Sequence, residues 1–213
     1  MRCHPHLLLG LLLVPATFAG CGDSPVSSGP GQVLHTYSFE KDMDGRDVKG
    51  TDLSVGDRPI EWSVARNLKM ARNGSASVKL TTNSLTDAGK IWMEKPFAVK
   101  PGRAYHVTVE CDFASADYGP VNLSRIITGL LPQPPLTEGH GKGVSALGPS
   151  ALQGDTGNGS DRDTGHRWLS TRYALTAQAG QGEALYPLVG VWGTIETDHT
   201  YYLDDVRVSL NEG

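Results

Sequence analysis

The segment from Ala104 to Ala114 constrains the fold more than any other part of this sequence. In the run AYHVTVECDFA, every second residue is Tyr, Val, Cys or Phe, and the residues between them are His, Thr, Glu and Asp. Successive side chains of a strand point to opposite faces, so this pattern predicts a half-buried β-strand with Cys111 facing inward. The preceding residues 100–103, KPGR, predict a turn.

The chain beyond Leu34 has the same character throughout. Short β-branched and aromatic runs are separated by Gly, Asn, Asp and Pro, and no apolar period of 3.6 residues is sustained. The sequence therefore predicts an all-β fold, a two-sheet antiparallel β-sandwich of the jelly-roll kind. The candidate strands are Leu34–Glu40, Ile60–Ala65, Ser75–Thr81, Lys90–Val99, Ala104–Ala114, Val121–Leu130, Arg167–Ala177, Ala184–Trp192 and Thr200–Leu210.

Residues 1–20 predict a signal peptide. Arg2 gives a positive start, the apolar run Leu7–Val14 is too short to span a bilayer, and small residues follow. Residues 18–21, FAGC, resemble the bacterial lipobox, which implies that Cys21 becomes the lipidated N-terminus. The alternative is ordinary cleavage after Ala19, without lipidation.

The lipobox resemblance implies an exported protein of the bacterial cell envelope, anchored in a membrane, with the outer membrane as the default. Residues 21–33 are rich in Gly, Ser and Pro and predict a flexible tether, so the folded domain spans 34–213. With Cys3 removed and Cys21 acylated, only Cys111 remains, and no disulfide framework is expected. Without acylation a bridge from Cys21 to Cys111 is conceivable, but a cysteine in mid-strand is a poor partner.

The stretch 129–165 interrupts the strand pattern. It holds many Gly and Pro residues and no apolar period, and it is too long for an ordinary connection. It is either a functional loop or a disordered insertion, and the Gly, Ser and Asp residues of its second half favour partial disorder.

Charge and motifs argue against two classes of function. The net charge is −4 and no run of Lys and Arg is present, so nucleic acid is not an expected partner. Motifs of serine hydrolases, zinc proteases and phosphate-binding loops are missing from the sequence, and we expect no enzyme activity. The histidines His140, His166 and His199 lack the spacing of metal ligands.

Two adjacent acids, Asp204 and Asp205, lie inside the β-branched and aromatic run Thr200–Leu210. Such a pair is unfavourable in a strand unless something stabilises the charges. One possibility is that one acid faces solvent while the other accepts backbone N–H groups. The other is a site for a hard cation such as Ca²⁺.

Six short motifs occur in an order that is informative together: Phe39–Glu40, Trp62, Gly74–Leu80, Pro101–Tyr105, Trp168–Ser170 and Tyr202–Val206. With them, the chain from Leu34 to Leu210 resembles the β-sandwich carbohydrate-binding modules of families four, nine and twenty-two, in the galactose-binding-like superfamily. The resemblance implies a jelly roll with a structural calcium ion. Its ligands would be Glu40, Asp204 and backbone carbonyls of residues 72–74, with Asp205 as a neighbour.

Binding of sugars requires exposed aromatic rings beside polar side chains. In the run ALYPLVGVW, Tyr186 and Trp192 share one face of the predicted strand, and this face is either a stacking platform or covered by a neighbouring loop. In KIWMEKPF, Trp92 and Glu94 share one face and Ile91 and Met93 share the other, and one of the two pairs can face outward, so Trp92 is a second candidate for ligand binding. Trp62 and Trp168 are expected in the core.

The polar face of the long strand could add hydrogen bonds if its sheet forms the concave side of the sandwich; it carries His106, Thr108, Glu110 and Asp112. The expected function is a non-catalytic, surface-anchored domain that binds a glycan or polysaccharide, together with a partner enzyme or surface protein. The alternatives are a structural or protein-interaction domain that keeps the sandwich without sugar binding, and a small jelly-roll hydrolase.

Overall fold

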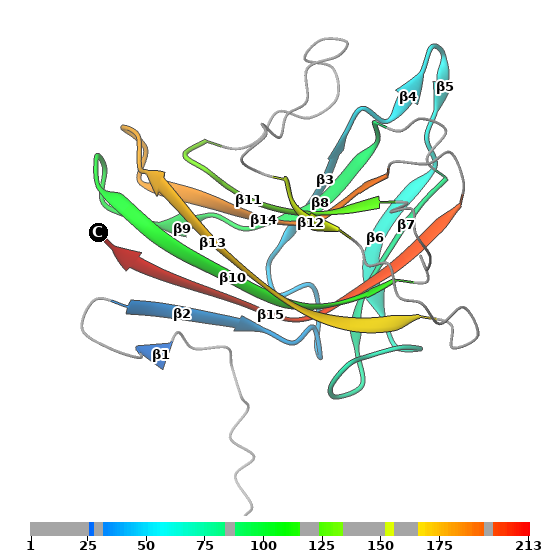
Figure 1. Ribbon diagram of the computed structural model, residues 1–213, viewed down its shortest axis with the longest axis horizontal. Helices are drawn as coiled ribbons and strands as arrows, with labels where there is room; N and C mark the ends of the chain where they lie inside the picture. The colour runs from blue at the N-terminus through cyan, green and yellow to red at the C-terminus, as the bar shows by residue number, and fades with distance from the viewer. Residues whose placement is uncertain are drawn as a thin grey trace, which may run out of the picture.

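The computed structural model describes residues 26–27, 32–83, 88–115, 124–133, 152–155, 166–193 and 198–213. These residues form two antiparallel sheets that pack face to face, which confirms the predicted β-sandwich (Figure 1). The predicted signal peptide, the lipidation candidate Cys21 and most of the stretch 129–165 lie outside the described residues. Among the described residues, no helix is long and apolar enough to cross a membrane.

The first sheet has seven strands among the described residues. Its main order is β1 (Val26–Ser27), β2 (Gln32–Tyr37), β15 (His199–Glu212), β10 (Ala104–Ser115) and β13 (Arg167–Gln178); β7 (Ser77–Thr82) pairs with β15 and also with β6 (Trp62–Asn67).

The second sheet has six strands within the same ranges. Its order is β12 (Leu152–Asp155), β11 (Ser124–Leu131), β14 (Ala184–Gly193), β8 (Lys90–Glu94) and β3 (Asp47–Thr51), with β9 (Phe97–Ala98) beside the start of β14; the strands β4 (Ser54–Val55) and β5 (Arg58–Pro59) form a separate hairpin.

The core lies between the two sheets, and β10 contributes to it as the sequence predicts. Val107, Val109 and Phe113 are buried there, and so is Cys111. Burial raises the pKa of the Cys111 thiol to about 11, because the charged thiolate loses its hydration. This thiol is therefore a core side chain in its neutral form.

Strand β15 changes partners in the middle, and the paired acids stand at the change. Residues 199–203 pair with β7, and residues 206–211 pair with β2. Opposite β10 the register shifts between Glu110 and Asp112, and Asp205 adopts a positive φ of 48°. Asp is one of the few residues that tolerate this conformation, so the bulge explains why an acid occupies position 205.

The structure also divides or extends some predicted elements. The predicted strand Lys90–Val99 is two strands, β8 and β9, separated by Lys95–Pro96, and proline has no N–H to give to a ladder. Strand β2 begins at Gln32, inside the predicted tether, and β12 lies inside the stretch predicted as a loop.

Candidate functional site

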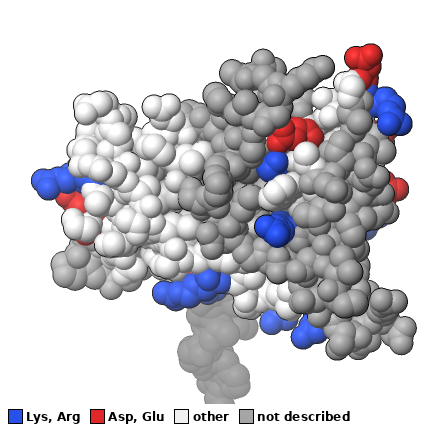
Figure 2. Space-filling view, turned by 45° about the horizontal axis from the view of Figure 1, so that its top comes forward, with Lys and Arg blue, Asp and Glu red and all other residues white. Residues whose placement is uncertain are grey.

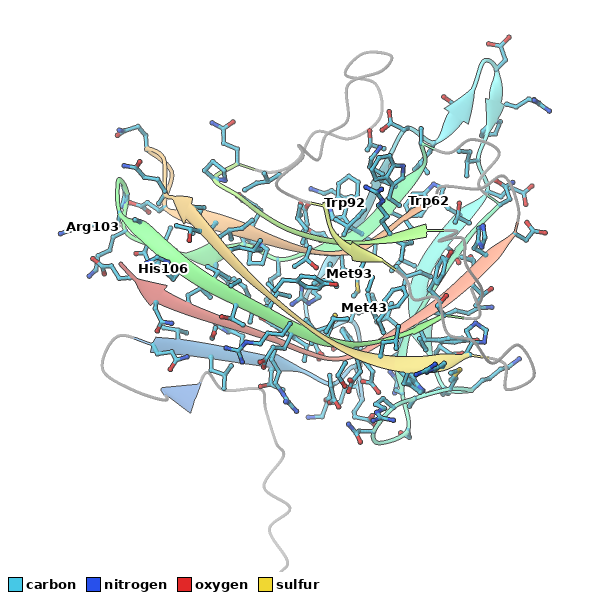
Figure 3. All side chains as sticks on the ribbon, in the orientation of Figure 1. Met43, Trp62, Trp92, Met93, Arg103 and His106 are labelled. Carbon is cyan, nitrogen blue, oxygen red and sulfur yellow. The ribbon has the colours of Figure 1, made fainter. Side chains whose placement is uncertain are left out.

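Trp92 lies on the outer face of the six-stranded sheet. Its neighbours Ile91 and Met93 belong to the core between the sheets, so Trp92 points to the other side of β8, as Figure 3 shows. There it forms a small apolar cluster with Ile127 and Leu188, and 0% of its surface is exposed. A fully buried indole offers no surface for stacking, which corrects the expectation that Trp92 itself contacts a ligand.

Trp192 lies on the same outer face and is only partly buried. In the register of the sheet it stands between Arg125 of β11 and Lys90 of β8. The Lys90 Nζ lies 4.6 Å from the centroid of the indole ring, and the Arg125 guanidinium carbon lies 5.7 Å from it. Both distances are those of cation–π interactions, so two cationic side chains position this ring.

The charges of this face are paired below its surface. The Glu94 carboxylate, which is 1% exposed, accepts the indole N–H of Trp92 at 2.8 Å and the Lys49 ammonium at 2.6 Å. The Lys90 ammonium donates to Asp52 at 2.8 Å. Figure 2, which brings this face forward, shows acidic and basic side chains next to each other near its centre.

Gly190 allows the strands of this face to lie close together. It stands opposite Trp92, and a Cβ built on it would lie 2.1 Å from the Ile91 carbonyl oxygen and 2.5 Å from the Trp92 Cα. Real carbon atoms do not approach backbone this closely, so a side chain at Gly190 would push β14 away from β8. Gly190 therefore fixes where Trp92 and Trp192 lie relative to each other.

Tyr186 shares the face but not the cluster. It is half-buried and stands opposite Leu131 at the other end of β14. Six residues of extended strand separate it from Trp192, which corresponds to about 20 Å. The structure thus brings Trp92 and Trp192 together and leaves Tyr186 apart. Alternation along the strand places Glu94 on the same face as Trp92, but Lys49, Lys90 and Arg125 were not predicted, because only the strand register reveals their positions beside the two indoles.

The predicted calcium ligands, Glu40 and Asp204, meet at one turn. Asp204 is 1% exposed, and its carboxylate accepts the backbone N–H groups of Arg72 at 2.8 Å, Asn73 at 3.1 Å and Asp205 at 2.8 Å. Burial raises the pKa of Asp204, and these backbone N–H groups oppose that shift. The turn thus presents N–H groups to Asp204, where a calcium site would present carbonyl oxygens.

Glu40 holds the next part of the same turn. Its carboxylate accepts the Ser75 hydroxyl at 2.7 Å and the backbone N–H groups of Ser75 at 3.0 Å and Ala76 at 3.1 Å. The hydrogen bonds from Ser75 hold the pKa of Glu40 below its usual range.

This arrangement fits two hydrogen-bond acceptors rather than two cation ligands. Ca²⁺ requires six to eight oxygen ligands, and the oxygens of Glu40 and Asp204 already face donors. Within the described ranges, no three Asp, Glu, His or Cys side chains gather as a metal site. Of the two possibilities predicted for the pair Asp204 and Asp205, the one in which an acid accepts backbone N–H groups describes the contacts of Asp204.

The outer face of the seven-stranded sheet is polar but already paired. Glu110 binds Arg172 at 2.5 Å, and Asp112 accepts the Ser170 hydroxyl. Both sheets bend in the same direction in Figure 1, so that the concave outer side belongs to the six-stranded sheet. Trp62 of β6 is 36% exposed, so its expected place in the core is wrong.

No protein-family model matches this sequence, and a comparison with curated protein sequences gives no significant match. Solved structures similar to this chain include the CBM22-1 xylan-binding domain from Paenibacillus barcinonensis Xyn10C, at 14% identity, 84% coverage of this chain, 94% of that chain and a TM-score of 0.43. Another is TmCBM61 in complex with β-1,4-galactotriose, at 12% identity, 80% coverage of this chain, 92% of that chain and a TM-score of 0.35. A third is the Stig cyclase Fisc from Fischerella sp. TAU, at 13% identity, 83% coverage of this chain, 89% of that chain and a TM-score of 0.43.

Carbohydrate-binding modules of the β-sandwich kind are thus among the similar structures, as the sequence resemblance predicts.

Proposed function

We propose that this protein binds a glycan or polysaccharide, without catalysis, on the outer face of the six-stranded sheet. The observation that supports this most is the environment of Trp192, a partly exposed indole with cationic side chains on both neighbouring strands. An indole can stack on the C–H face of a sugar ring, and the exposed Arg125 guanidinium beside it can donate to hydroxyl groups, whereas Lys90 is buried and supports the ring from below the surface.

The buried part of the face supports this proposal through rigidity. The hydrogen bond between Trp92 and Glu94 and the ion pair of Glu94 with Lys49 fix side chains beneath the surface. A face that is already ordered loses little conformational entropy of its own when a ligand binds, which favours binding.

A glycan-array screen of the purified protein tests the proposal, with oligosaccharides of xylan and β-1,4-galactan among the probes. We expect binding to at least one polysaccharide class, and we expect the signal to be weakened by about tenfold or more in the Trp192→Ala variant. An array without any signal from a folded protein would contradict glycan binding.

The second candidate function is that of a structural or protein-interaction domain that does not bind sugars. The burial of Trp92 favours it, because only one indole of the pair is left to contact a ligand. A folded protein that binds no glycan but retains a protein partner would support this candidate.

We also propose that the domain is carried on a lipid anchor at Cys21, in the outer membrane of a bacterial envelope. The FAGC motif supports this proposal. Labelling of cells with an alkyne-bearing palmitate should mark the protein, and the Cys21→Ala variant should remain unlabelled. Equal labelling of both proteins would contradict the anchor.

A further inference from the structure

A groove of about 820 Å³ opens at the edge of the sandwich where β2 and β9 lie across from each other. Its walls come from Val33 and His35 of β2, from residues 95–100 around β9, and from the ends of β10 and β15. Binding sites for small molecules measure about 300 to 1,000 Å³, so this groove has the size of a ligand site. It does not include Trp192, so it is separate from the proposed glycan face.

The walls of the groove are mainly apolar and contain stacked rings. The His35 ring lies on Phe97 with centroids 4.4 Å apart and planes inclined by 18°. Val33 is 42% exposed at the groove, and Tyr105 and Leu210 also line it. An apolar ligand body of one or two rings would remove the exposed part of this surface, chiefly Val33, from contact with water.

The basic side chains around the groove differ in their partners. Lys100 and Arg103 share the carboxylate of Glu212, at 2.7 and 3.4 Å. The ammonium of Lys95 instead donates to a neutral acceptor, the backbone carbonyl of Asp44, at 2.7 Å. Lys95 therefore contributes positive charge to the wall of the groove.

A second positive charge lies behind this wall. Arg46 is 5% exposed, and none of its three guanidinium nitrogens has a hydrogen-bond acceptor in the described structure. Its guanidinium carbon lies 4.1 Å from the centroid of the Tyr37 ring, and the Lys95 Nζ lies 5.1 Å from the same centroid. Burial lowers the pKa of Arg46 to about 10 and the nearby Asp44 carboxylate opposes this shift without a hydrogen bond to the guanidinium, so Arg46 stays charged at neutral pH. A buried guanidinium without an acceptor is costly, and a nearby anion would stabilise it.

We propose that this groove binds a small amphipathic acid, with an apolar body between Val33 and Phe97 and a carboxylate at Lys95. Arg46 does not line the groove, and it acts on the ligand through its positive potential without touching it. Burial lowers the pKa of His35, together with the charges of Lys95 and Arg46, so that its ring remains neutral and serves as an apolar wall.

Isothermal titration of the purified protein with 4-phenylbutyrate tests the proposal, with 4-phenylbutanol as the uncharged control. We expect the acid to bind about tenfold more tightly than the alcohol, since one ionic contact contributes on the order of a tenfold change in Kd. Equal affinity for both compounds would overturn the acidic specificity, and no heat of binding with either would overturn the site.

Two variants locate the binding. Lys95→Met should weaken the acid about tenfold and leave the alcohol unchanged. Val33→Glu, at an exposed position, should weaken both compounds by blocking the groove. Lys69→Met removes an exposed lysine outside the groove and should change neither affinity. If the acid binds both groove variants as tightly as the wild type, it binds elsewhere and the proposal fails; circular dichroism establishes that each variant is folded.

Discussion

Trp92 donates its indole N–H to the Glu94 carboxylate at 2.8 Å, two residues along the same strand. This bond joins the apolar cluster of the outer face to its charges, since Glu94 also binds Lys49. Both side chains are buried, although they lie on the side of the sheet that faces away from the core. The outer face of the six-stranded sheet is thus built as a second ordered layer.

Replacing Glu94 should show how much this layer contributes to stability. Glu94→Ala leaves the buried Trp92 N–H without its acceptor, and we expect a loss of about 1–3 kcal/mol in the free energy of unfolding. Glu110→Ala is the matched control, because its pair with Arg172 is exposed and worth below about 1 kcal/mol. Urea denaturation measures both. Equal losses would show that Glu94 has no special structural role.

Gly190→Ala should destabilise the protein by about 1–3 kcal/mol, because its Cβ would collide with the backbone of β8. Gly180→Ala is the control, since no atom lies within 4 Å of its Cβ position. Thermal unfolding should show a lower Tm for the first variant only. A Gly190→Ala protein as stable as the wild type would contradict the close approach of β14 and β8.

The fold could be predicted from the sequence because apolar residues alternate clearly in its long strands. Eight of the nine predicted strands occur as single strands, the ninth, Lys90–Val99, is divided into β8 and β9, and the boundaries of β10 and β13 differ from the prediction by one residue. The sequence DVKGT of β3 escaped prediction, since it contains Gly and two charges and forms a strand through its pairing with β8.

The candidate site could be predicted only in part. Alternation places Trp192 and Trp92 each on one face of its own strand, but it does not say which strands are neighbours. The register between β14 and β8 brings Lys90 beside Trp192, and a buried lysine is an unusual residue that no local pattern predicts. The sequence likewise left open whether Asp204 accepts backbone N–H groups or binds a cation, because no local pattern shows that Arg72 and Asn73 lie beside it.

The stability of the protein should depend on Glu40 in acid. Because the folded pKa of Glu40 lies below its ordinary value of 4.5, its carboxylate stabilises the fold above that value, and this is lost as the pH falls through the folded pKa. The stability difference between the wild type and Glu40→Gln should therefore shrink below pH 4.5. The pKa of Asp204 is raised, so its contribution to stability increases rather than decreases as the pH falls, and Asp204 cannot cause this loss. Urea denaturation across this range measures the difference, and a constant difference would contradict it.

Calcium should not be needed for the turn at residues 72–76, because hydrogen bonds already account for both carboxylates that hold it. We expect the same Tm in EDTA and in excess calcium chloride. A Tm that rises with calcium and falls with EDTA would instead support the calcium site predicted from the family resemblance. Asp204→Asn would then abolish the calcium effect, which would assign it to this turn.

The affinity of Trp192→Ala for the glycan found on the array tests the central proposal most directly. Trp62→Ala is the matched control, because Trp62 is an exposed tryptophan of the other sheet. Isothermal titration should show binding weakened by about tenfold or more in Trp192→Ala, as expected for the loss of one stacking ring, and unchanged binding in Trp62→Ala. Wild-type affinity in a folded Trp192→Ala protein would contradict glycan binding on the six-stranded sheet.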